Sequence, residues 1–155
     1  HLIEQFAAHT SFRRYFCVIP GKLEARTIST MFVRDRGDGV RGSSADAIHG
    51  KHAVTHVKPM RVIGDYSELE CQLETGRTNQ IRIHLAELRH PICGDVKYHG
   101  PFGEPPIDDK SRAPRLALHA ADLGFVHPKS GDNLNFSVPL PRDLQQFIAR
   151  LEKMQ

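Results

Sequence analysis

The stretch from Thr75 to Tyr98, TGRTNQIRIHLAELRHPICGDVKY, places the strongest local constraint on how this chain folds. A glycine-containing turn opens it, and Pro91 disfavours helical geometry at the residue before it. A second turn follows at Gly94-Asp95. The pattern therefore predicts a helix over roughly residues 79 to 89, bounded by two turns. The buried face of this helix is predicted to carry Ile81, Leu85 and Leu88.

Two arginines in this stretch point to an anionic partner. Arg77 lies on the opening turn, where free backbone N–H groups and cations gather in one place. Arg82 lies one step off the apolar stripe of the predicted helix. An arginine at the edge of a buried face needs a carboxylate or a phosphate to satisfy its donors.

The run TGRTNQIRIHLAELRHPICGD resembles the late motif of the RluA-type pseudouridine synthases, which reads close to TGRTHQIRVHLA, then GHPI, then GD. The departures are Asn79, where the family usually has His, and Arg89, where it usually has Gly. Arg13 and Tyr15 resemble the family's K-x-Y motif, with Arg in place of Lys. The segments RLALHAADLGFVHP and NLNFSVPLPRDLQQFI are similar to later parts of the same family.

The resemblance implies a function and a set of site residues. It implies isomerisation of uridine to pseudouridine in ribosomal or transfer RNA, without a cofactor, at a site that holds the uridine out of its stack. Tyr15 would lie against the uracil, and Arg82 would pair with the catalytic aspartate. The expected RNA-binding residues are Arg13, Arg14, Arg77, Asn79 and Gln80, the last two of which would contact RNA or shape the loop. For Arg82 the alternative is a buried cation tied to another acid, and for Tyr15 an ordinary strand aromatic.

The family's aspartate belongs to an HRLD-x-x-TSG motif, and none of the ten aspartates here follows Arg-Leu. Residues 1 to 155 are therefore expected to be a single domain that forms the C-terminal portion of a pseudouridine synthase catalytic domain. Alone it would be inactive, and Arg82 would lack its carboxylate. An interrupted sheet exposes an edge and an apolar face, so we expect self-association, a separate polypeptide that carries the missing part, or a stability lower than that of an intact domain.

Pattern and resemblance together predict an α+β fold with a mixed, mostly antiparallel sheet flanked by helices. Alternation and turn residues favour strands at 12–19, 26–34, 52–63 and 66–74. Helical spacing favours helices at 2–9 and 142–154, the second with Leu144, Phe147, Ile148 and Leu151 inward. Residues 35 to 50 are polar and Gly-rich, which indicates a solvated loop or a frayed hairpin. Its arginines Arg34, Arg36 and Arg41 would touch RNA phosphates if the loop is functional.

Composition limits the class of protein. With 39% hydrophobic residues and no long apolar run, no membrane span is expected. Cys17, Cys71 and Cys93 are far apart and odd in number, which indicates buried thiols in a reducing compartment, and no leader argues for secretion. A cytoplasmic location is therefore expected. Fourteen of the 21 basic residues are arginines, a bias that favours nucleic acid.

Histidines offer a competing interpretation. His49, His52 and His56 have a spacing that would place metal ligands on one helix face. In a strand, however, only the last two share a face, so no metal site is predicted. His84 and His119 are expected to be hydrogen-bonded structural histidines. Two alternatives to the synthase remain, namely a non-catalytic RNA-binding module on the same scaffold and a metal-dependent hydrolase that uses the histidines.

Overall fold

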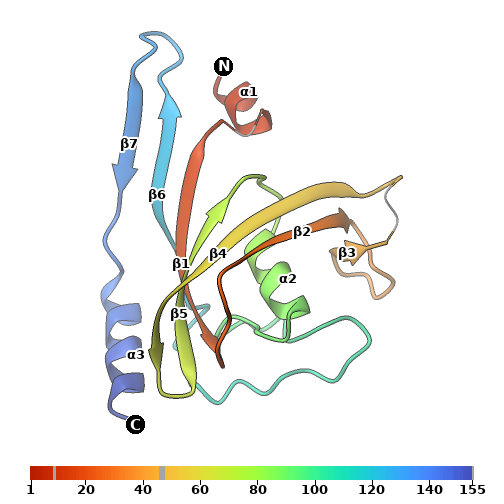
Figure 1. Ribbon diagram of the computed structural model, residues 1–155, viewed down its shortest axis with the longest axis vertical. Coiled ribbons are helices and arrows are strands. Elements are labelled where there is room, and N and C mark those ends of the chain that lie inside the picture. Colours follow the sequence, from red (N-terminus) through yellow and green to blue (C-terminus); the bar gives the residue numbers. More distant parts are fainter. Residues whose placement is uncertain (9, 46–47, 155) are drawn as a thin grey trace.

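The computed structural model describes residues 1–8, 10–45 and 48–154, which form one antiparallel sheet with three helices (Figure 1). The sheet order is β3-β2-β4-β5-β1-β6-β7, and each neighbouring pair is antiparallel. The strands are β1 (Phe12–Pro20), β2 (Arg26–Val33), β3 (Gly42–Ser44), β4 (Lys51–Ile63), β5 (Tyr66–Leu73), β6 (Leu118–Val126) and β7 (Asn133–Ser137). The helices are α1 (Leu2–Ala7), α2 (Gln80–Glu87) and α3 (Arg142–Glu152). The α+β prediction is confirmed.

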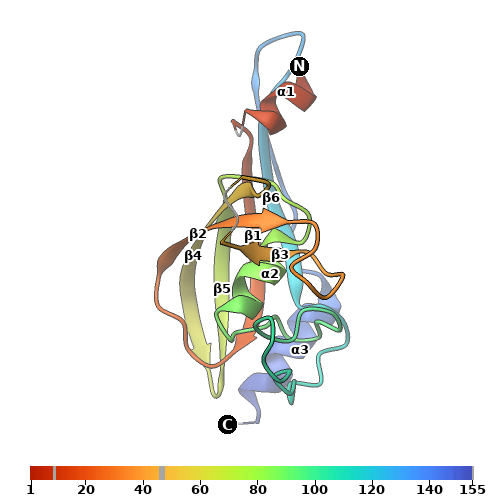
Figure 2. The same ribbon diagram turned by 90° about the vertical axis from the view of Figure 1, so that its right-hand side faces the viewer.

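The four strands predicted from alternation correspond to β1, β2, β4 and β5, and the two predicted terminal helices correspond to α1 and α3. The 35–50 segment contains the short strand β3, which pairs with β2, so the hairpin interpretation of this loop is confirmed. His9, at the end of the first predicted helix, lies outside the described residues. In the side view of Figure 2, the long β6–β7 hairpin extends beyond the rest of the sheet together with α1.

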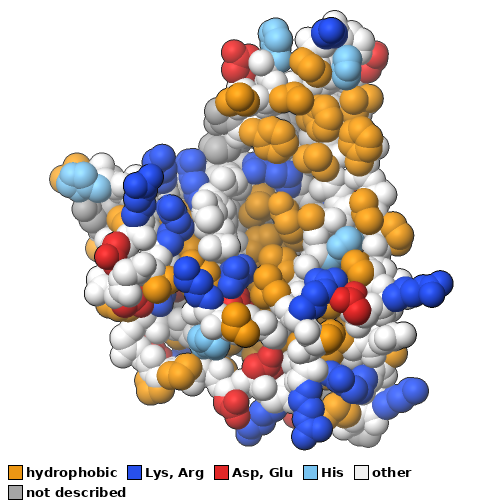
Figure 3. Space-filling view, turned by 180° about the vertical axis from the view of Figure 1, so that it is seen from behind, with side chains coloured by type: hydrophobic (Ala, Val, Ile, Leu, Met, Phe, Trp, Pro, Cys, Tyr) orange, Lys and Arg blue, Asp and Glu red, His pale blue; other side chains and the backbone are white. Residues whose placement is uncertain are grey.

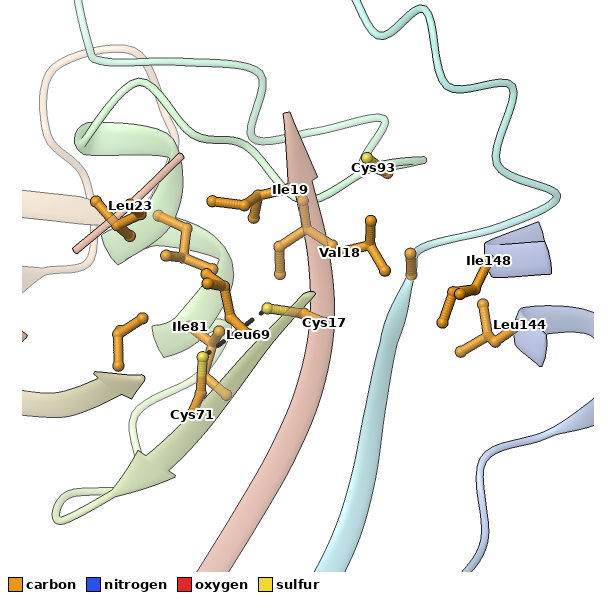
Figure 4. Close-up of a cluster of buried hydrophobic side chains, with 14 of the residues drawn as sticks. Cys17, Val18, Ile19, Leu23, Leu69, Cys71, Ile81, Cys93, Leu144 and Ile148 are labelled. Carbon is orange, nitrogen blue, oxygen red and sulfur yellow. Dashed lines mark hydrogen bonds between the residues drawn. The ribbon is translucent and has the colours of Figure 1, made fainter. Parts of the chain in front are cut away.

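The core is built around β1, because successive side chains of a strand point to opposite faces. Leu144 and Ile148 of α3 line a small cavity with Phe16 and Val18. In Figure 4, Ile81 of α2 lies on one side of β1, and the two α3 residues lie on the other. The predicted inward residues of α3, Leu144, Phe147, Ile148 and Leu151, are all buried.

Both ends of α2 have left-handed backbone, and both coincide with a departure from the family motif. Asn79 caps the N-terminus at φ 59°, and Arg89 follows the C-terminus at φ 65°. Asn and His tolerate this region better than most residues, whereas Gly adopts it without a steric cost. The backbone therefore explains why His and Gly suit these two positions. Arg89 compensates in part through an ion pair with Glu104.

A buried polar network fastens α2 to the sheet. His84 is fully buried, and its ring nitrogens lie 2.8 Å from the hydroxyl oxygen of Thr55 on β4 and 3.0 Å from that of Thr30 on β2. Glu87, one turn later, accepts hydrogen bonds from the backbone N–H and the hydroxyl of Ser43 on β3. The structural role predicted for His84 is confirmed. These contacts fix where the first turn of α2 projects its side chains.

All three cysteines lie in the core, as predicted for buried thiols. Cys17, Cys71 and Cys93 are buried and free, with Sγ atoms 3.8 Å apart in the first pair. Burial raises the pKa of the Cys93 thiol to about 12. Within the described residues, the helices are too short or too polar to cross a membrane.

The burial of His84 predicts a specific dependence of stability on pH. Burial lowers the pKa of His84 from 6.5 to about 4, so between these values the unfolded chain binds a proton that the folded chain does not. The contribution of His84 to the free energy of unfolding is therefore fully present above pH 6.5 and is lost as the pH falls towards 4. Between pH 7 and pH 5 the free energy of unfolding should decrease by on the order of 2 kcal/mol from His84 alone.

Urea unfolding at the two pH values measures this decrease. The variant His84→Gln retains hydrogen-bonding capacity without a titrating ring, and its stability should change much less over the same interval. An equal decrease in the variant and the parent protein would contradict the assignment to His84.

Candidate active site

A cavity of about 260 Å³ lies between β1, the first turn of α2 and the segment before β6. Five of the seven predicted site residues line it, namely Tyr15, Arg77, Asn79, Gln80 and Arg82. Leu73, Ile81, Leu116 and Leu118 form its apolar part. Figure 3 shows this face hollowed near its middle, with hydrophobic side chains on the floor and Lys or Arg side chains around it. An apolar floor with a few converging polar groups suits a flat base and its sugar.

Arg82 is held in a fork by Asp95. The Nε and Nη2 atoms of Arg82 donate to the two carboxylate oxygens at 2.7 and 2.8 Å, and Nη1 donates to the side-chain oxygen of Asn79 at 3.2 Å. The guanidinium also lies over the Tyr98 ring, 4.9 Å from its centroid. The expectation that Arg82 lacks a carboxylate was therefore wrong. The alternative interpretation, a cation tied to another acid, describes its partner in this chain.

This pairing leaves part of Arg82 available. A guanidinium has five N–H donors, and the three hydrogen bonds above use three of them. The side chain is 20% exposed and lines the cavity. Arg82 can therefore remain bound to Asp95 and still donate to a second anion in the cavity.

Asp95 itself is closed to reaction. Its side chain is 0% exposed, and it also accepts from the backbone N–H groups of Lys97 and Tyr98, both at 2.9 Å. Burial alone would raise the pKa of Asp95, but the hydrogen bonds from Arg82 and from the backbone N–H groups outweigh it and hold this pKa below its usual value. Asp95 is thus an ionised, fully hydrogen-bonded group that orients Arg82 and does not reach the cavity.

Tyr15 lies on β1 opposite Cys71 of β5, with its ring packed against the hydrophobic core and its side chain partly exposed. Among the described residues, no hydrogen-bond partner is found for its hydroxyl. One side of the ring is therefore fixed by packing, whereas the cavity side stays open. This arrangement lets an aromatic ring support a planar base.

Gln80 shapes the turn through hydrogen bonds inside the protein. Its amide is 2% exposed, donates to the carbonyl of Val54 and the hydroxyl of Thr55, and accepts from the hydroxyl of Thr75 and the backbone N–H of Arg77. Of the two roles expected for Gln80, the structure shows the one in shaping the loop. Arg77 is then held at the cavity rim, with Nε donating to the carbonyl of His52 at 2.8 Å.

The other two predicted RNA-binding residues lie away from the cavity. Arg13 is 8% exposed and donates to the carbonyl of Glu74, and a Cβ at Gly76 would collide with its guanidinium. Arg14 points to the other face of β1, where it pairs with Asp122 and Glu70. Arg13 therefore supports the turn from beneath, and Arg14 stabilises the sheet. The RNA-binding role expected of both residues stays a prediction.

The histidines do not form a metal site in the described part of the chain. His52 and His56 share hydrogen bonds with Ser29 and Thr27, and no group of three potential ligands is found among the described residues. His119 is bonded to the carbonyl of Val138, as expected for a structural histidine. In the loop, Arg36 pairs with Asp38 and lies over Phe102, so it is not presented to a phosphate.

Asp95 is the functional residue that the sequence analysis missed. It belongs to the GD turn of the motif, and it is the carboxylate that an arginine at the edge of a buried face needs. The described residues that line the cavity include no carboxylate. The site thus supplies an aromatic ring, a fixed cation and hydrogen-bond donors, but no acid that can reach a sugar.

The Arg82–Asp95 pair predicts a stability difference between two similar forks. Arg82→Met leaves a fully buried carboxylate without its cation, and the free energy of unfolding should fall by about 3 kcal/mol. Arg115 forms an analogous fork with Asp143 in which both side chains are more than 40% exposed, so Arg115→Met should change stability much less. Urea unfolding at neutral pH compares the two, and equal losses would show that Asp95 is not buried as described.

Comparison with known proteins gives this site a family. A model of the RNA pseudouridylate synthase family matches residues 1–87. The chain is 40% identical over 154 residues to an uncharacterized RNA pseudouridine synthase, YlyB, of Bacillus subtilis, covering 98% of this chain and 48% of that protein. It is 36% identical over 159 residues to ribosomal large subunit pseudouridine synthase D of Xanthomonas campestris, covering 98% and 47%. The chain thus spans about half the length of these curated relatives.

Solved structures agree at the level of the fold. Human RNA pseudouridylate synthase domain containing 4 superimposes with a TM-score of 0.75 at 21% identity, covering 97% of this chain and 66% of that one. Human RNA pseudouridylate synthase domain containing 1 gives a TM-score of 0.72 at 22% identity, covering 96% and 69%. Together with the family match and the curated relatives, these findings show that the chain belongs to the RNA pseudouridylate synthase family.

Proposed function

We propose that this chain forms the base-holding and RNA-holding part of an active site that isomerises uridine to pseudouridine in ribosomal or transfer RNA. The observation that carries the proposal is the single cavity that unites Tyr15, Arg82 and the 75–80 turn. Membership of the family supports the reaction class. Three buried free thiols support a reducing compartment such as the cytoplasm.

The reaction breaks the bond between C1′ of the ribose and N1 of uracil, and rejoins the same carbon to C5. The proton on C5 leaves, and N1 gains one, so the base is both leaving group and nucleophile and no cofactor takes part. Tyr15 would support the plane of the uracil while it turns. Arg82 would use its remaining donors to hold the catalytic carboxylate ionised.

We propose that the catalytic carboxylate comes from sequence outside these 155 residues. Asp95 is buried and fully hydrogen-bonded, and the described cavity lining contains no other acid. We therefore propose that the 155 residues alone do not turn over uridine. The apolar side chains exposed near the β6–β7 edge, Phe12, Val126, Phe136 and Val138, would be covered by the segment that brings the aspartate or by a second copy of the chain, which sedimentation velocity would distinguish.

The second candidate is a non-catalytic RNA-binding module on the same scaffold. The lack of a carboxylate among the described lining residues favours it. It predicts RNA binding without turnover, whether or not further sequence is added.

Release of tritium from RNA labelled at C5 of uridine tests the two candidates. The 155 residues alone should release none, whereas a protein extended on the amino-terminal side through an HRLD motif should release tritium. In the extended protein, Tyr15→Leu, which removes the aromatic ring, and Arg82→Lys should each lower the rate, by roughly tenfold or more, because ring placement and the arginine fork act at the reacting atoms.

The matched control is Arg61→Lys, which alters an arginine paired with Glu68 and Glu152 that does not line the cavity, and it should leave the rate unchanged. Absence of turnover in the extended protein, with RNA binding intact, would overturn the isomerase proposal and favour the binding module.

A further inference from the structure

A second cavity, of about 250 Å³, adjoins the first and is lined by cations. It lies over β2 and the start of β4, and four of its lining side chains are Arg34, Arg41, Lys51 and Arg77. Phe32, buried and directly opposite Lys51 in the strand register, forms its floor. The lining contains no Asp or Glu among the described residues. Figure 3 shows Lys and Arg side chains gathered on one side of the central hollow.

These cations differ from most other arginines in the protein because the described residues supply them with no carboxylate. Six arginines elsewhere pair with carboxylates, namely Arg14, Arg36, Arg61, Arg82, Arg89 and Arg115. Within the described ranges, no carboxylate pairs with Arg34, Arg41 or Lys51. Like charges collected in a concave surface create a positive potential that an anion relieves. The second cavity therefore suits an anion that the described part of the chain does not supply.

Arg77 connects the two cavities, because it lines both. Its backbone N–H and Nε are fixed by Gln80 and by the His52 carbonyl, so its position between the cavities is rigid. A nucleotide in the first cavity would thus place its neighbouring phosphates beside Arg77 and the second cavity. A strand around a flipped uridine is unpaired, and unpaired strands bind in positively charged grooves.

We propose that the second cavity binds the phosphodiester backbone of the RNA strand adjoining the target uridine. Arg34, Arg41 and Lys51 contact phosphates, and Arg77 holds the strand where it passes between the cavities. The inference rests on the proposed function in one respect, that the ligand is RNA. It adds a site whose purpose is to fix the strand, apart from the residues that act on the base.

Salt dependence of RNA binding tests this site with the 155-residue chain itself. The probe is a fluorescein-labelled oligouridylate of about twelve nucleotides, a length within the usual site sizes for single strands. The readout is fluorescence anisotropy at several NaCl concentrations. Each lost phosphate contact lowers the slope of log K against log salt by about 0.7 and weakens binding roughly fivefold at about 0.1 M salt. The triple variant Arg34→Gln, Arg41→Gln, Lys51→Gln should thus lose about 2 units of slope and roughly 100-fold in affinity.

The controls remove two positive charges elsewhere, against three in the triple variant. Arg142→Gln and Lys129→Gln alter exposed cations at the start of α3 and in the β6–β7 turn, and should leave slope and affinity nearly unchanged. Circular dichroism of every variant verifies that it is folded. Wild-type affinity and slope in the triple variant, or no RNA binding by the parent chain, would overturn the proposal.

Two further arms separate the possible explanations. Inorganic pyrophosphate tests for a free-anion site, and if the triple variant loses pyrophosphate binding but retains RNA binding, the RNA assignment is overturned. Tritium release in the extended protein tests the isomerase separately. RNA binding that depends on the three cations, without tritium release, would refute the isomerase and support this phosphate-binding site. Tritium release, with unchanged RNA binding in the triple variant, would support the isomerase and refute this site.

Discussion

The hydrogen bonds of one buried amide hold the site together. Gln80 begins α2, and its side chain joins β4 to the turn before the helix through contacts with Val54, Thr55, Thr75 and the backbone of Arg77. A buried amide that lost these partners would carry a large desolvation cost, so the turn has little freedom to move. This turn also fixes the position of Arg77, which lines both cavities. The position of each cavity relative to the sheet thus depends on this link.

Most elements of the fold were predicted from local sequence patterns. Alternating β-branched and aromatic residues predicted β1 and β4, the Gly64-Asp65 turn predicted the β4–β5 hairpin, and Pro91 predicted the end of α2. These signals are short-range, so one sequence reveals them. The bounds of β3 were not predicted, because its three small residues, Gly-Ser-Ser, carry no alternation and the strand is held by tertiary contacts with β2 and Glu87. Family membership was also predicted from motifs, and the comparisons confirm it.

The site was predicted in part, and its errors have a common cause. Tyr15 and Arg82 were named, and they do line one cavity, although their catalytic roles stay predictions. The partner of Arg82 was missed because Asp95 lies beyond the helix and meets the guanidinium only when the GD turn folds back. The face on which Arg14 lies was not predicted: strand alternation puts it opposite Tyr15, and its RNA-binding role stays a prediction. Motifs indicate which residue types are present, whereas the direction in which a side chain points and the partner that it contacts depend on tertiary structure.

The fork between Arg82 and Asp95 has a consequence for how a reaction centre is assembled. Because the guanidinium is already desolvated, oriented and neutralised inside this chain, an arriving acid meets a preorganised donor and need not freeze a flexible side chain. Ordering such a side chain otherwise costs about 1.5–2 kcal/mol of entropy. Assembly would therefore lose little free energy at this contact, and the local electric field would be in place before the substrate enters.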